Sequence, residues 1–164
     1  LFVANVLTIR RLADLQSEGV RLLGLPDTDE GLSCPNATPE EQKILGDPGN
    51  GIALLCLSGP LVFGSAKAVT RQQYALTDAR SLIVDLTDVP HIGVTTSLAV
   101  ESTVREAAAR GCRVYLSGLN DQARKRFESL GLRDVVPADN WISRRADALQ
   151  RAVSERAGQV RTGG

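Results

Sequence analysis

The sequence predicts an α/β fold in which a mixed, mostly parallel sheet is flanked by helices. Short apolar runs of strand length alternate along the chain with longer segments whose apolar residues recur every three or four positions. Such alternation implies right-handed crossovers between parallel strands. The run at residues 82–86, LIVDL, is apolar apart from its aspartate, as expected for a strand covered on both faces. With 164 residues, the chain is long enough for one domain with a substantial core.

The first 58 residues divide into an apolar stretch, two strands and an acidic loop. Residues 1–9 are mostly apolar and Arg10 and Arg11 follow them. Nine residues cannot span a bilayer, which needs about 20, so residues 1–19 are either the exit of a longer membrane helix or an amphipathic linker helix. Residues 20–25 and 51–58 have strand composition, and an antiparallel first strand is compatible with the pattern. Between them, the loop at 27–50 carries six carboxylates against one lysine, and Thr38-Pro39 predicts one short helix in it.

The turn after the second strand has two glycines at the spacing of a phosphate-binding P-loop. Residues 59–67, GPLVFGSAK, place Ser65 directly after Gly64, where a P-loop requires lysine. Because free N–H groups at a helix start attract anions, Gly64 and Ser65 are candidate contacts for an anion or a nucleotide. The alternative is a plain strand-to-helix turn. The helix is predicted from one face, formed by Ala66, Val69, Gln73 and Leu76.

A strand, a tight turn and a helix then follow in immediate succession over residues 81–111. Asp88, Pro90 and Gly93 interrupt the strand pattern, and Gly111 is expected to end the helix. The hydroxyls of residues 95–97 are expected to cap the helix start. The face expected to be buried consists of Ser97, Val100, Val104, Ala107 and Ala108.

The C-terminal part predicts one strand, two helices and a short extended segment. Residues 112–117 alternate like a strand with one better-covered face, and Asn120 is expected to cap a helix ending at Gly131. Residues 135–136 predict a last short strand. Asn140 is expected to cap the final helix, whose inward face would be Ile142, Ala146, Leu149 and Val153. Residues 157–164 are expected to form a flexible tail.

Composition and spacing argue against several functions. Nineteen basic residues balance nineteen acidic ones and only 4% of the residues are aromatic, so we expect no nucleic-acid binding. His91 is the only histidine and no GxSxG motif surrounds a serine, so we expect no catalytic residues, no metal site and no cofactor. Cys34, Cys56 and Cys112 lack CxxC spacing and indicate neither zinc nor a disulfide framework. Because the chain contains no methionine, we expect it to be a piece of a longer protein.

The central unit resembles the STAS domain, which occurs in sulfate transporters and in bacterial antagonists of anti-sigma factors. The matching features are the apolar strand at 82–86, Val89 and Ile92 in the turn, and the Ser/Thr-rich helix start at 95–98. Residues 57–66, LSGPLVFGSA, resemble the strand and turn before the first helix of that family. The resemblance covers residues 20–153 and implies a STAS-like fold, with the domain at 20–156 and the acidic loop at 27–50 as an insertion.

The resemblance departs from the antagonists at their phosphorylated serine. An Asp-Ser pair begins this helix in the antagonists, and Gly93 and Val94 stand at the matching positions here. The departure suits the SulP family of membrane anion transporters, whose cytoplasmic C-terminal STAS domains often lack that serine. The first residues resemble the junction with the last membrane helix of SulP proteins. Together with residues 88–101, DVPHIGVTTSLAVE, this junction is most similar to the cyanobacterial bicarbonate transporters of that family.

The resemblance implies a non-catalytic domain on the cytoplasmic face of the plasma membrane. Its implied partners are the membrane domain of the same transporter and a second copy of itself in a homodimer, and its implied role is the regulation of transport, with sodium-coupled bicarbonate as cargo. The expected regulatory or interaction residues are Val94, Thr95, Thr96 and Ser97. Sulfate or another anion stays open as the cargo. Two other functions stay open: a soluble partner switch of the anti-sigma-factor-antagonist type, and a weak nucleotide-binding domain.

Overall fold

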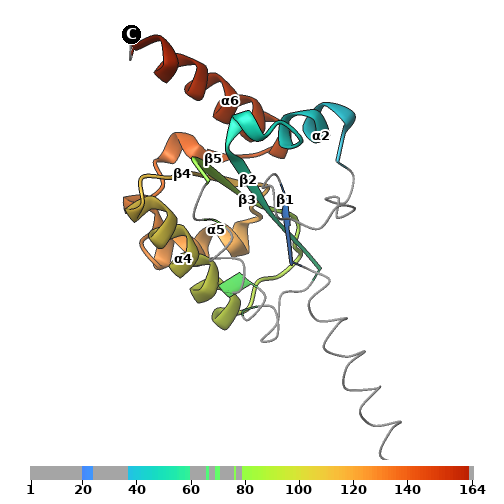
Figure 1. Cartoon of the computed structure of the whole chain (residues 1–164). Helices are drawn as coiled ribbons and strands as arrows, with labels where there is room; N and C mark the ends of the chain where they lie inside the picture. Colours follow the sequence, from blue (N-terminus) through green and yellow to red (C-terminus); the bar gives the residue numbers. More distant parts are fainter. Residues whose placement is uncertain are drawn as a thin grey trace, which may run out of the picture.

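The computed structural model describes residues 20–23, 37–59, 66, 69–70, 76 and 79–162, and a five-stranded sheet lies at its centre (Figure 1). The strands follow one another across the sheet in sequence order. β1 (Val20–Leu23) is antiparallel to β2 (Ile52–Ser58), whereas β3 (Ser81–Asp88), β4 (Arg113–Ser117) and β5 (Trp141–Ile142) continue from β2 in parallel. The predicted mixed, mostly parallel α/β fold is confirmed.

Helices cover both faces of the sheet and enclose two apolar clusters. Figure 1 shows α4 (Val94–Ala109) and α5 (Asp121–Ser129) on one side, and α2 (Pro39–Leu45) and α6 (Arg145–Thr162) on the other. The side chains of β2 divide between them. Ala53, Leu55 and Leu57 belong to the cluster under α4 and α5, while Ile52, Leu54 and Cys56 belong to the cluster under α6. Short 3₁₀ helices lie at Pro48–Asn50, Leu132–Asp134 and Ala138–Asn140.

The helix predicted inside the acidic loop is confirmed, and its start is fixed by reciprocal hydrogen bonds. The backbone N–H of Glu41 donates to Thr38 Oγ1 at 3.3 Å, and the backbone N–H of Thr38 donates to Glu41 Oε2 at 2.9 Å. Pro39 occupies the first helical turn, where its missing N–H costs nothing. Such a cap stabilises a helix by about 1 kcal/mol, which matters here because α2 has only seven residues.

The predicted helix ends of the C-terminal half are largely confirmed. Asn120 caps α5 by accepting a hydrogen bond from the N–H of Ala123 at 2.8 Å. Gly131, with φ of 75°, and Gly111, with φ of 84°, follow the ends of α5 and α4 in the left-handed conformation that glycine adopts most easily.

Three expectations for the region after α4 are wrong. Both faces of β4 are covered, because α6 buries Tyr115 in the second cluster. Residues 135–136 follow a 3₁₀ helix and form no strand. The last strand lies instead at Trp141–Ile142, so Asn140 caps no helix and donates from Nδ2 to the carbonyl of Val114 at 3.1 Å. α6 therefore begins at Arg145, and Ile142 belongs to the sheet.

Several predictions fall wholly or partly outside the described residues. Residues 1–19 and the first part of the acidic loop, residues 27–36, lie outside them, and of the helix predicted after Ser65 only a few positions are described, among them the buried Val69 and Leu76. The division of the chain at 19/20 and 156/157 stays a prediction, and α6 continues to Thr162. The described cysteines correct one expectation, because Cys56 is disulfide-bonded, whereas Cys112 is a free thiol. No described helix combines the length and apolar character that crossing a membrane requires.

Candidate functional site

The start of α4 presents two exposed apolar side chains beside a threonine. Val94 is 55% exposed and Leu98 is 46% exposed, and because they are four residues apart they lie on the same helix face. Thr95 is exposed next to Val94. The N-cap is Gly93, which has no side chain to cap the helix. Val94 and Leu98 are the exposed large hydrophobic residues of the described chain, so this face is the natural candidate for contact with a partner.

The other two hydroxyls predicted at this helix start point into the protein. Thr96 and Ser97 are fully buried. Ser97 Oγ donates to the carbonyl of Gly93 at 2.5 Å and lies 3.1 Å from the carbonyl of Val94. The expectation that residues 95–97 cap the helix is therefore wrong, because the helix begins before them and the Ser97 hydroxyl serves backbone carbonyls. Of the predicted interaction residues, Val94 and Thr95 are exposed, whereas Thr96 and Ser97 are inaccessible.

Two side chains at the start of α5 hold the loop that leads into α4. The N–H of Ile92 donates to Gln122 Oε1 at 3.1 Å, and Gln122 Nε2 donates back to the carbonyl of Ile92 at 3.0 Å. Asn120 Nδ2 lies 3.2 Å from the carbonyl of Val89 and 3.0 Å from that of Pro90. The amide of Gln122 thus binds one residue of the loop as a neighbouring strand would, and it fixes where α4 begins.

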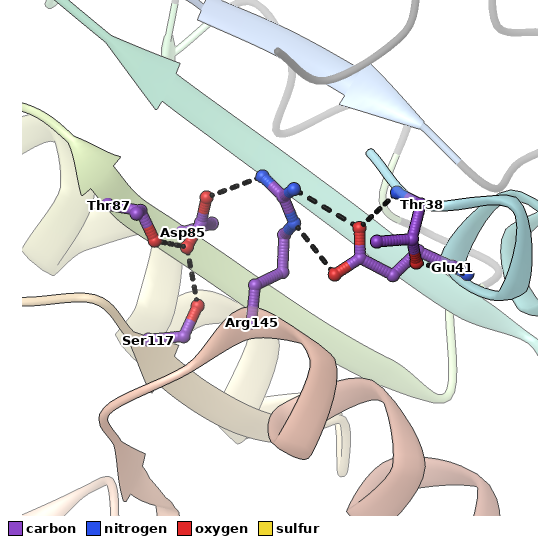
Figure 2. A network of polar contacts seen from close by, with 6 residues as sticks. All are labelled: Thr38, Glu41, Asp85, Thr87, Ser117 and Arg145. Atoms are coloured by element: carbon purple, nitrogen blue, oxygen red, sulfur yellow. Dashed lines mark hydrogen bonds and ion pairs between the residues drawn. The ribbon is translucent and has the colours of Figure 1, made fainter. Parts of the chain in front are cut away.

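A buried polar network surrounds Asp85 in β3, the strand that precedes the loop into α4 (Figure 2). Asp85 is fully buried. Its Oδ1 accepts hydrogen bonds from Thr87 Oγ1 at 2.6 Å and from Ser117 Oγ at 2.8 Å. Its Oδ2 pairs with Arg145 Nη1 at 3.1 Å. Close approach of the two strand ends also requires Gly118, because a Cβ there would lie 2.7 Å from the Cα of Thr87.

Arg145 joins Asp85 to Glu41, which is the acidic member of the cap of α2. Arg145 Nη2 lies 3.1 Å from Glu41 Oε2, and Nε lies 3.4 Å from Glu41 Oε1 (Figure 2). Burial lowers the pKa of Arg145, but the hydrogen bonds and charges of Glu41 and Asp85 outweigh burial, so the pKa is raised above its ordinary value. One charged guanidinium therefore connects the first residue of α6, the cap of α2 and the strand that leads to α4.

The remaining candidates from the sequence form no site within the described part of the chain. Gly64 and Ser65 lie outside the described residues, so their contact with an anion or nucleotide stays a prediction. His91 is an exposed loop residue before α4. The described residues hold no group of three or more His, Cys, Asp or Glu side chains placed to bind a metal ion.

Sequence reasoning missed the partners of these groups. Asp85 lies within the predicted strand at 82–86, but nothing in the spacing indicates that Arg145, 60 residues later, supplies its counter-charge. The sequence did contain one indication, a carboxylate within the otherwise apolar run at 82–86, because a buried charge needs a partner. The position of Gln122, two residues after the N-cap Asn120, gave no indication that its side chain binds the backbone of Ile92.

The fold and this geometry define an α/β domain whose buried polar groups satisfy one another and whose exposed feature is the start of a helix. Residues 48–149 match the family described as the STAS domain, and the chain belongs to that family. Over 154 residues, 93% of its length, it is 44% identical to the bicarbonate transporter BicA of Synechocystis. It spans about a quarter of that protein, 26% of its length.

Solved structures show the same fold. The STAS domain of a SulP transporter from Vibrio cholerae is 24% identical with a TM-score of 0.53, and the match covers 62% of this chain and 80% of that one. The anti-sigma factor antagonist SpoIIAA in its unphosphorylated form is 16% identical with a TM-score of 0.52, covering 61% of this chain and 86% of that one. The resemblance to STAS domains that the strand–turn–helix motif indicates is confirmed.

Proposed function

We propose that the chain is the cytoplasmic C-terminal STAS domain of a SulP-family anion transporter, with bicarbonate, taken up together with sodium, as the cargo. The observation that carries the proposal is the 44% identity to BicA over 93% of the chain. The domain has no transport path of its own. It acts as a non-catalytic module that forms a homodimer and contacts the membrane domain of the same transporter at the cytoplasmic face of the plasma membrane.

The start of α4 is the proposed contact with the partner. Val94 and Leu98 offer an apolar surface that gains free energy when another protein covers it. The two hydrogen bonds between the side-chain amide of Gln122 and the backbone of Ile92 keep this surface in a fixed position relative to the sheet. A pre-organised surface loses little conformational entropy on binding, so its contacts convert efficiently into affinity.

The network around Arg145 is the proposed link between the acidic loop and that surface. Thr38 and Glu41 mark the point where the loop enters α2, and Arg145 ties Glu41 to Asp85. A partner that binds the loop can therefore favour one of two arrangements of α2 relative to Arg145 and β3, while the start of α4 keeps its position. Transport is regulated in this proposal because the membrane domain binds the two arrangements with different affinity.

The test uses the full-length protein in cells that lack other bicarbonate uptake. A truncation from Val20 onward should reduce both assembly and sodium-dependent uptake of labelled bicarbonate. Val94→Asp combined with Leu98→Asp should reduce uptake at an unchanged membrane level, while Ser102→Asp, which adds charge at an exposed position of the same helix, should leave uptake unchanged. Normal assembly and normal transport in the truncation would refute the proposal.

Localisation is tested separately by immunoblot of membranes washed with alkaline carbonate. The proposal expects an antigen that stays in the membrane and migrates far above 17.5 kDa. A soluble antigen near that mass contradicts it and favours the second candidate.

The second candidate is a soluble partner switch of the antagonist type, which the likeness to SpoIIAA favours at the level of fold. Thr95 is its acceptor because it is exposed, whereas Thr96 is buried. Incubation with cognate kinases should then add one phosphate to the intact mass, and Thr95→Ala should abolish the addition. No mass change in the parent chain contradicts this candidate. Calorimetry with ATP and GTP tests the nucleotide alternative at Gly64 and Ser65.

A further inference from the structure

A basic pocket of about 350 Å³ lies at the edge of the sheet where β3 and β4 begin. This edge is opposite to the one from which α4 starts. The walls come from the beginnings of these two strands, the end of α4 and the middle of α6. Four arginines line it, Arg80, Arg110, Arg113 and Arg156, and no described lining residue is acidic.

The carboxylates around this pocket neutralise its arginines only in part. Arg113 Nη1 pairs with Glu155 at 2.6 Å, but Glu155 also pairs with Arg151 at 3.0 Å. Arg110 is 3.5 Å from Glu106. Within the described chain, Arg80 makes no ion pair, and Arg156 donates to the neutral side-chain carbonyl of Asn50 at 3.1 Å. The pocket therefore holds an excess of positive charge.

The backbone fixes the position of Arg80 relative to the other arginines. Its N–H donates to the carbonyl of Gly51 at 2.8 Å, and its carbonyl accepts from the N–H of Arg113 at 3.0 Å. The stem of Arg80 packs over Gly51, where a Cβ would lie 3.2 Å from Arg80 Cγ. Because Gly51 has φ of 61°, glycine is favoured there for its backbone as well as for the space.

The negative end of the α4 dipole faces this region but is capped. The N–H groups of Gly111 and Cys112 donate to the carbonyls of Ala108 and Ala107, each at 3.0 Å. These bonds satisfy carbonyls that would otherwise repel an anion at the pocket.

We propose that this pocket binds the phosphate group of a small phosphorylated molecule. Guanidinium groups bind phosphate through paired N–H donors, and several of them together favour a multivalent oxyanion over a monovalent one. The volume is within the usual range for small-molecule sites, about 300–1,000 Å³, and exceeds the needs of a bare phosphate. Ala79, Gly111 and Ala152 line the remaining space without charge. Binding at this pocket does not depend on the proposed transport function.

The test is calorimetric titration of the 164-residue chain with inorganic pyrophosphate at 50 mM NaCl. We expect one saturable site that weakens strongly at 300 mM NaCl, because partly exposed charges are screened. The double variant Arg80→Gln, Arg156→Gln should weaken binding by about tenfold or more, since hydrogen bonds to charged groups are lost. Arg144→Gln is the matched control, because Arg144 is exposed outside the pocket and should leave binding unchanged.

Amide chemical shifts give a second measurement that does not depend on heat. Residues 80–81 and 110–113 should shift on addition of pyrophosphate, with Val94 as an unaffected reference. The proposal is overturned if pyrophosphate gives neither heat nor shifts, or if Arg144→Gln weakens binding as much as the double variant does.

Binding to lipid vesicles distinguishes a phosphate carried by a lipid headgroup from one carried by a free small molecule. Sedimentation with phosphatidic acid vesicles but not with phosphatidylcholine vesicles, abolished by the double variant, assigns the site to a lipid headgroup. Pyrophosphate binding without sedimentation assigns it to a free phosphorylated molecule. Either result supports the pocket, and both are measured on the isolated chain, so failure of the transport experiments leaves them standing.

Discussion

Replacing Arg145 by methionine removes the cation that two buried carboxylates share. The side chain of Asp85 is fully buried and that of Glu41 is 6% exposed, so neither carboxylate is well solvated once the guanidinium is gone. Methionine fills much of the same volume without charge. We expect the variant to be strongly destabilised, because leaving a buried charge unpaired costs more than the intact pair contributes.

The contacts set the size of this effect. Arg145 makes three hydrogen bonds to the two carboxylates, at distances between 3.1 and 3.4 Å. Breaking a buried pair by removing one partner costs about 3–5 kcal/mol, against a total stability of about 5–15 kcal/mol for a typical domain. For a chain of this length, each kcal/mol lowers the melting temperature by about 2–4 °C, so we expect a decrease of about 10 °C.

The assay is urea unfolding of the 164-residue chain followed by far-UV circular dichroism. Arg110→Met is the control, since its 3.5 Å pair with Glu106 lies on the surface and should contribute no more than about 0.5 kcal/mol. The triple variant Glu41→Gln, Asp85→Asn, Arg145→Met should recover at least half of the loss, because no charge is left unpaired. A loss below about 1 kcal/mol in the single variant, or no recovery in the triple variant, refutes the reasoning.

Three further predictions concern other described groups. Gln122→Ala should lower the free energy of unfolding by about 1–3 kcal/mol, because two hydrogen bonds to Ile92 are lost; Gln122→Glu, which can accept but not donate, should fall between parent and alanine variant in the same urea assay. Burial and the hydrogen bond to Glu155 raise the pKa of Tyr115 to about 12. Because the unfolded chain loses this proton near pH 10 and the folded chain retains it, stability should decline between pH 10 and 12, and Tyr115→Phe should flatten that decline; parallel curves would contradict the assignment. Burial raises the pKa of the Cys112 thiol to about 11, so iodoacetamide at pH 7.5 should alkylate it about a hundredfold more slowly than an unfolded cysteine, as measured by mass spectrometry of its peptide.

Local signals predicted most of the fold because they act within a few residues. The cap formed by Thr38 and Glu41, the strand at 82–86 and the end of α4 at Gly111 all depend on neighbours in sequence, and the structure confirms each of them. The failures depend on tertiary contacts. The alternation at 112–117 predicted a strand with one better-covered face, with Tyr115 on the other, but α6 covers Tyr115 from more than 30 residues away.

The candidate site was predictable only in part for the same reason. Val94 and Thr95 lie exposed at the start of α4, and their role in regulation or interaction stays a prediction. The inward orientation of Ser97, however, depends on a helix that begins at a glycine without a side-chain cap. The pairing of Asp85 with Arg145 could not be deduced, because Arg145 follows Asp85 by 60 residues, and Glu41, the other carboxylate that Arg145 binds, precedes Asp85 by 44 (positions 41, 85 and 145).

The sequence order of the strands across the sheet has a consequence for synthesis on the ribosome. Each new strand pairs with the one made just before it, so the sheet can grow one strand at a time as the chain emerges. Of the elements that the structure describes, α6 emerges last, and its first residue is Arg145. Until then the carboxylates of Glu41 and Asp85 have no guanidinium between them. The side of the sheet that α2 and α6 cover is therefore incompletely packed in the nascent domain until α6 emerges. A chain stalled on the ribosome before residue 145 should still be cleaved by added proteases.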